Sequence, residues 1–146
     1  MTRTSLIAII PLAVLLCSGS AIAQITPIGL WKVIDDDTKQ PLSQVRISAE
    51  KGTLSGKIEK LLDTSRPHPT CSKCTDERKG QAMLGMTIMR NVKAAGDGTW
   101  EGGEILDPNN GKVYRVRLQP LDAGTVLEVR GYIGPFFRNQ HWQRVE

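Results

Sequence analysis

Apolar and polar residues alternate one by one along much of the chain. Between residues 44 and 50, Val45, Ile47 and Ala49 alternate with polar or charged neighbours, and the same rhythm continues in 53–62 and 112–119. A period of two is typical of a β-strand with one buried face. Beyond the first two dozen residues, no segment shows a sustained apolar period of 3.6, so we predict an all-β domain.

The pattern predicts about eight strands, near 29–35, 44–50, 53–62, 83–92, 98–106, 112–119, 124–133 and 138–145. Turn sequences such as EKGT, DPNNGK and PLDAGT separate several of them. Because most connections are short, sequential neighbours should pair antiparallel. A sandwich is the alternative, but sequential hairpins favour an eight-stranded antiparallel up-and-down barrel. The interior of such a barrel is either filled by side chains or holds one small ligand.

The first residues have the features of a secretory signal peptide. Arg3 supplies positive charge, 6–16 is apolar, and Ala21-Ile22-Ala23 is a small-x-small cleavage signal. The apolar run is shorter than the roughly 20 residues of a membrane span. Lipidation at Cys17 is disfavoured because Leu16 occupies the place of a small residue. We therefore expect removal of 1–23, a single domain over 24–146, and a periplasmic or secreted protein without a membrane span.

The charge balance narrows the list of partners only slightly. The chain has 19 Lys and Arg and 15 Asp and Glu residues; loss of Arg3 leaves 18 against 15, a net charge of +3. This mixed balance does not indicate a nucleic-acid partner, and we expect none in an exported protein.

Two cysteines remain in the predicted mature chain, Cys71 and Cys74, within the long connection 63–82. A redox centre would need the strand–helix context of thioredoxin-like proteins. A metal site could combine the two thiols with His68 and either Asp76 or His141, but a second C-x-x-C is missing. Export to an oxidising compartment favours the third reading, a disulfide. We predict no metal or other cofactor.

The acidic residues give no catalytic assignment. Residues 35–37 form an acidic run at a predicted turn, and Glu101, Glu104 and Asp107 are spaced along WEGGEILD. Turn and surface roles explain both groups. Only His68 and His141 offer imidazole bases, and no nucleophile or phosphate-loop motif occurs. We name no catalytic residue and lean towards a protein that is not an enzyme.

Three arginines form a candidate patch for an anion or a partner: Arg115, Arg117 and Arg130 share the polar face of one predicted hairpin. If Leu118 faces Leu127, then Arg117 faces Glu128 and Arg115 faces Arg130. Directly opposed like charges are unfavourable unless an anion or acid lies between them. An ordinary solvated strand face is the alternative.

Seven segments occur in an order that resembles a known family: GLWKVIDD, GTLSGKIEKLL, CSKC, GMTIMR, WEGGEILDPNNGKVY, LEVRGYIG and RNQHWQR. They resemble the exported bacterial domain of unknown function 2147, over nearly all of 29–144. The resemblance implies a lipocalin-like barrel in the cell envelope and carries no established biochemical activity.

The lipocalin comparison also implies structural roles for two residues. Trp31, in a G-x-W on the first strand, would close one end of the barrel, and Arg144 on the last strand would lie across its ring. Such a cation–π contact stabilises by roughly 0.5–2 kcal/mol. The leading functional hypothesis is non-catalytic binding of a small, partly apolar ligand. The alternative is a module that docks on another envelope protein or on peptidoglycan.

Overall fold

The structure, a computed structural model, describes residues 25–146. The predicted signal peptide, including Cys17, lies outside the described residues. Eight strands and one short 3-10 turn follow in order: β1 (Gly29–Ile34), β2 (Pro41–Glu50), β3 (Thr53–Leu61), β4 (Thr87–Gly96), β5 (Thr99–Asp107), β6 (Lys112–Leu121), η1 (Asp122–Gly124), β7 (Val126–Ile133) and β8 (Phe136–Arg144).

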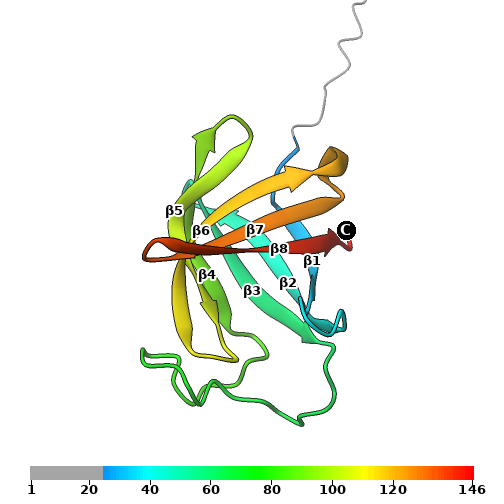
Figure 1. Cartoon of the computed structure of the whole chain (residues 1–146), viewed down its shortest axis with the longest axis vertical. Helices are drawn as coiled ribbons and strands as arrows, with labels where there is room; N and C mark the ends of the chain where they lie inside the picture. Colours follow the sequence, from blue (N-terminus) through cyan, green and yellow to red (C-terminus); the bar gives the residue numbers. More distant parts are fainter. Residues whose placement is uncertain (1–24) are drawn as a thin grey trace, which may run out of the picture.

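Each strand pairs antiparallel with its neighbour in sequence, and β8 returns to β1, so the sheet closes into a barrel (Figure 1). This confirms the predicted up-and-down barrel. The closing seam is the shortest pairing: only Trp31 with Arg144 and Lys32 with Gln143 are in register. Towards the other end of the barrel, β1 and β8 are therefore not joined by strand pairing.

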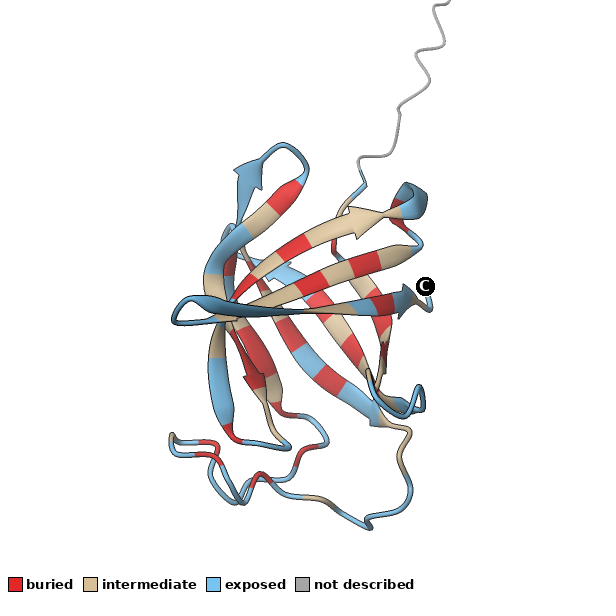
Figure 2. Cartoon of the chain, in the orientation of Figure 1, coloured by how far each residue is buried: buried red, intermediate tan, exposed pale blue. Residues whose placement is uncertain are grey.

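Inward and outward positions alternate as the sequence pattern predicts. In β2, Ser43, Val45 and Ile47 are buried while the residues between them are not, and Figure 2 shows the same alternation along other strands. The two largest fully buried side chains are Trp31 and Trp142. These inward faces form one hydrophobic cluster inside the barrel.

Gly103 shows why a strand interior carries a glycine here. A Cβ at this position would overlap the carbonyl oxygen of Arg90 and lie 2.7 Å from the backbone nitrogen of Val92. The pairing of β5 with β6 shifts register between Glu101 and Gly103. The glycine therefore permits a bulge and a close approach of β4.

The predicted start of the fourth strand, residue 83, is wrong, because β4 begins at Thr87. Residues 83–86 instead end the long connection. The backbone N–H of Met83 donates to Pro69, that of Met86 to Met83, and that of Gly85 to Ile58. Met83 and Met86 are buried, so their apolar character reflects loop packing rather than strand alternation.

The antiparallel topology gives the barrel two unlike ends. The chain termini and the turns β2–β3, β4–β5 and β6–β7 lie at one end. The connections β1–β2, β3–β4, β5–β6 and β7–β8 lie at the other, and we call that end the mouth. The long connection 62–86 belongs to the mouth and runs along the lower part of Figure 1.

Candidate functional site

The mouth end of the barrel interior is hollow. A cavity of about 840 Å³ lies between the strand ends and the mouth connections. Its inner wall is apolar and comes from strands on all sides, with contributions from Val33, Ile58, Ile88, Ile105, Val129 and Trp142. The volume lies within the range of roughly 300–1,000 Å³ that small-molecule sites occupy.

Side chains fill the other half of the interior. Trp31, Ile47, Met89, Leu118 and Leu127 are almost completely buried and do not line the cavity. The barrel is therefore packed at one end and hollow at the other. The hollow half is the half that lies at the mouth connections.

The rim of the cavity is polar and mostly acidic. Four aspartates, Asp35, Asp37, Asp63 and Asp107, line it, together with Arg66 and Arg138. Asp35 accepts hydrogen bonds from the backbone N–H of Asp37 and from both the N–H and the hydroxyl of Thr38. The bonds from Thr38 are the main reason that the pKa of Asp35 lies below its ordinary value. Asp35 thus orders its own turn, as the sequence suggested for the acidic run.

Arg138 bridges the seam between β8 and β1 at the mouth end of the barrel. It lies on β8, and its guanidinium pairs with Asp36 of the β1–β2 connection, with 2.7 Å between Nη2 and Oδ2. The hydrogen bond that Arg138 donates to the carboxylate of Asp36 raises the pKa of Arg138, and the charges of Asp36, Asp37 and Asp107 add to the shift. The ion pair joins β8 to the end of β1 where the seam has no strand pairing. Arg138 had no predicted role, although the alternation in RNQHWQR places residues 138, 140, 142 and 144 on one face of the strand.

One polar pair lies deeper in the cavity wall. The indole N–H of Trp142 donates to Oε1 of Gln140 at 3.1 Å, and both residues line the cavity. Because the ring of Trp142 is 1% exposed, this bond satisfies a buried donor. Neither Trp142 nor Gln140 had a predicted role.

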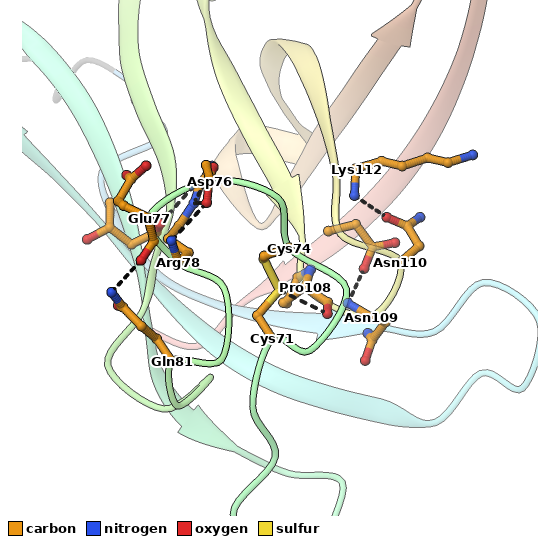
Figure 3. Close-up of a disulfide and its surroundings, with 12 residues drawn as sticks. Cys71, Cys74, Asp76, Glu77, Arg78, Gln81, Pro108, Asn109, Asn110 and Lys112 are labelled. Carbon is orange, nitrogen blue, oxygen red and sulfur yellow. Dashed lines mark hydrogen bonds and ion pairs between the residues drawn. A yellow bond between two sulfur atoms is a disulfide. The ribbon is translucent and has the colours of Figure 1, made fainter.

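Cys71 and Cys74 form a disulfide, the reading favoured for these residues. Both are almost completely buried, and Figure 3 places them against the β5–β6 turn beside Pro108. His68 and Asp76 do not join them: among residues 25–146, no group of three His, Cys, Asp or Glu side chains is placed to hold a metal ion. The disulfide does not line the cavity, whereas 63–66 and Pro69 of the same connection do.

A buried arginine anchors the rest of this connection. Arg78 is 3% exposed; its Nε donates to Asp76 Oδ2 at 3.0 Å, and its Nη1 donates to the carbonyl of Thr87 at 3.2 Å (Figure 3 shows the pair with Asp76). The hydrogen bonds from Arg78 lower the pKa of Asp76 to about 2. Arg78 was not predicted to be important, because nothing in the sequence of a charged loop shows which basic side chain becomes buried.

The closed end centres on Trp31 and Arg144. The guanidinium of Arg144 lies 4.1 Å from the centre of the Trp31 ring. It donates to the carbonyls of Gly124, Ile28 (2.9 Å) and Thr26 (2.8 Å). The indole N–H of Trp31 donates to the carbonyl of Pro27 at 2.7 Å. The two residues thus tie residues 26–28 before β1, the β6–β7 turn and β8 into one cap.

The three arginines of the predicted patch lie on the outer face of β6 and β7, but the predicted pairing is wrong. Arg117 is opposite Arg130, and Arg115 is opposite Tyr132. The side chains are arranged so that Arg130 stacks over Phe137 at 4.7 Å and Arg115 over Tyr132 at 5.5 Å. Arg130 also contacts Glu128 at 3.4 Å, an acid on its own strand.

No helix within residues 25–146 is long and apolar enough to cross a membrane.

Among curated proteins, none shows significant sequence similarity to the chain. One solved structure is similar to the barrel: protein HP1028 of Helicobacter pylori, described as belonging to the lipocalin family. It superposes with a TM-score of 0.70 at 15% sequence identity, over 82% of each chain. At this identity the similarity concerns the fold.

A family model matches residues 29–144, almost the entire described part of the chain. The family is described as an uncharacterized protein conserved in bacteria, DUF2147. The matched range begins at Gly29 of β1 and ends at Arg144 of β8, so it spans the complete barrel. The chain therefore belongs to the DUF2147 family, and its fold is a closed, lipocalin-like barrel.

Proposed function

We propose that this protein binds a small, partly apolar ligand in the barrel cavity, without catalysis, in the periplasm or outside the cell. The observation that carries the proposal is the cavity of about 840 Å³, with its apolar inner wall and polar rim. An elongated molecule with an apolar body and a polar end matches this distribution, because the body would displace water from the wall and the end would stay at the rim.

The chemistry of the lining supports binding rather than reaction. The inner wall offers mainly aliphatic side chains, the ring of Trp142 and the neutral groups of Ser43 and Gln140. The rim aspartates Asp35 and Asp63 have pKa values below the ordinary range because neighbouring residues donate hydrogen bonds to them. They therefore stay ionised at neutral pH, unlike a general acid.

The export part of the proposal rests on the sequence of residues 1–23. Fractionation of cells that express the whole gene tests it. We expect the protein in the periplasm or the medium, with Gln24 as its first residue by mass. An uncleaved chain in the cytoplasm would refute this part alone.

The binding test uses protein purified from its native compartment under mild conditions. Native mass spectrometry should show a non-covalent adduct that organic solvent extracts. After extraction, N-phenyl-1-naphthylamine, an uncharged apolar fluorophore, should bind with increased fluorescence and be displaced by the extracted compound.

Filling the cavity supplies the control. Leu42 and Leu61 are half-buried and line the cavity near the mouth, so Leu42→Trp and Leu61→Trp should block probe binding without overpacking the closed end. Val113 lies on β6 and does not line the cavity, so Val113→Trp should leave binding unchanged. Equal binding by wild type and both filled variants would defeat the proposal.

A further inference from the structure

The β7–β8 hairpin ends in an exposed apolar tip, which we define as residues 133–137. Within it, Ile133 is 45% exposed, Phe136 73% and Phe137 60%. The two phenylalanines are the most exposed large hydrophobic residues in the part of the chain that the structure describes. Single exposed apolar residues are ordinary on protein surfaces. Ile133 and Phe136 are paired on one face of the hairpin, and Phe137 lies on the other face opposite Tyr132, so the tip exposes apolar side chains on both faces. An apolar tip of this kind is typical of an interaction surface.

Two arginines stack on aromatic rings of this hairpin. Arg130 lies over Phe137 and Arg115 over Tyr132, and the rings of Tyr132 and Phe137 are themselves in contact, 6.1 Å between centres. Arg117 is directly opposite Arg130. The aromatic face of the hairpin is thus bordered by three guanidinium groups.

Acids near this surface neutralise it only in part. Glu128 lies 3.4 Å from Arg130 and 3.7 Å from His141. Glu104 and Glu101 are opposite Arg115 and Arg117 on β5, yet none of the ion pairs found within the described residues joins them across these strands. Arg115 and Arg117 therefore remain available to an external anion.

The tip also lies at the functional end of the barrel. By strand direction, β7 runs towards the mouth and β8 runs away from it, and in Figure 1 their connection projects at the left of the barrel, above the long connection. Arg138, the residue after Phe137, lines the cavity.

We propose that the tip docks on an anionic phospholipid surface. Ile133, Phe136 and Phe137 enter the boundary between head groups and acyl chains, and Arg115, Arg117 and Arg130 lie against lipid phosphates. Aromatic side chains favour this boundary, and nearby arginines add attraction to anionic head groups. Docking through the tip does not require that the cavity bind a ligand.

Charge complementarity favours a lipid surface over a second copy of the chain. A symmetric dimer through this face would bring the same arginine-bordered patch of two copies together. The positive charges of both patches would then lie in one interface, which is unfavourable without intervening anions. A phosphate-bearing surface supplies those anions.

Cosedimentation of the whole mature protein with vesicles tests the proposal. One set contains phosphatidylglycerol with phosphatidylcholine, and the other contains phosphatidylcholine alone. We expect binding to the anionic set and a decrease with added salt. Phe136→Ser with Phe137→Ser, and separately Arg115→Gln with Arg130→Gln, should each weaken binding by about 10- to 30-fold.

Matched controls keep this result interpretable. Leu84 is 56% exposed on the β3–β4 connection, so Leu84→Ser controls for loss of an exposed apolar residue. Lys60 and Lys93 are exposed on β3 and β4, so Lys60→Gln with Lys93→Gln controls for loss of two positive charges. Circular dichroism and thermal unfolding show that every variant is folded. Both controls should bind nearly as the wild type does.

Three outcomes would overturn the proposal. The first is that the wild type binds neither vesicle set. The second is that the tip variants bind as well as the controls. The third is that the wild type binds neutral and anionic vesicles equally. Light scattering after gel filtration runs alongside: a dimer that the phenylalanine variants dissociate, without vesicle binding, would assign the tip to self-association. Capture of an acidic protein without vesicle binding would also refute the lipid assignment.

Discussion

Gly111 packs directly against the backbone of Lys73. A Cβ at Gly111 would overlap the carbonyl oxygen of Lys73 and lie 2.9 Å from the backbone nitrogen of Cys74. The contact joins two segments that look unrelated in the sequence, the β5–β6 turn DPNNGK and the loop CSKC. It explains how a long connection without strands of its own is held at the mouth.

Replacement of Gly111 by alanine should therefore destabilise the protein more than an ordinary glycine replacement. Gly98 gives a matched control, since its φ of +70° is close to the +73° of Gly111 and nothing lies within 4 Å of its Cβ position. Gly98→Ala carries only the backbone strain, on the order of 1 kcal/mol. Gly111→Ala adds displacement of the loop, and we expect a total of about 2–4 kcal/mol in urea unfolding. Equal losses for the two variants would show that the contact is dispensable.

The disulfide should affect the long connection more than the barrel. Cys71 and Cys74 close a loop of about four residues, for which the chain-entropy model gives at most about 2 kcal/mol. Cys71→Ala with Cys74→Ala should lower the free energy of unfolding by no more than this. Trypsin cleavage within 66–79 should become faster while barrel circular dichroism is retained. Complete unfolding of the variant would assign the disulfide a larger role.

Arg144 should be important for stability because it joins three backbone carbonyls and the Trp31 ring. Arg144→Ala removes charge-assisted hydrogen bonds and a cation–π contact together. We expect a loss on the order of 2–4 kcal/mol. Arg144→Lys should fall between wild type and alanine, because one ammonium cannot reproduce the planar fork. Urea unfolding measures both, and an unchanged Arg144→Lys would contradict the geometry.

The Asp76–Arg78 pair should make stability depend on pH in acid. Hydrogen bonds from Arg78 lower the pKa of Asp76 to about 2, from 3.8. A carboxyl whose pKa is depressed on folding stabilises the folded state above its unfolded pKa, and this contribution disappears as the pH falls from about 4 to 2. Because Asp76 is partly exposed, we expect about 1 kcal/mol from it.

Asp76→Asn isolates this effect. At neutral pH the variant leaves Arg78 buried without its carboxylate, so it should be clearly less stable than wild type. Between pH 4 and 2 the difference should shrink, because the wild type loses its charge there and the variant has none to lose. Denaturant unfolding at several pH values measures the difference, and a constant difference would refute the assignment.

Much of the fold followed from local pattern. The inward and outward faces of β2, β3, β6 and β7 were predictable because side chains alternate strictly along a strand. Short turns between those strands then favoured antiparallel neighbours. The start of β4 was not predictable, because Met83 and Met86 are apolar for reasons of loop packing.

The pairing of β6 with β7 shows that the alternation of residues along a strand does not predict the register between two strands. The expected register, Leu118 with Leu127, implies a two-residue turn. The structure has a four-residue turn, 122–125, with positive φ at Asp122 and Ala123, and it places Leu118 opposite Val129. A shift of two residues keeps every side chain on its predicted face but changes every partner. The arginines therefore pointed outward as expected but faced different neighbours.

The sequence by itself determined the number and order of the strands, most of their faces, the family and the favoured cysteine pairing, because each depends on residues close together or on a fixed series of motifs. Only the tertiary structure decided that one half of the barrel is packed and the other hollow. It also decided that Arg138 reaches Asp36 across the unpaired part of the β1–β8 seam and that Arg78 is buried. These features depend on how far opposite walls stand apart and on which distant side chains meet, and neither is encoded in the period of a single strand.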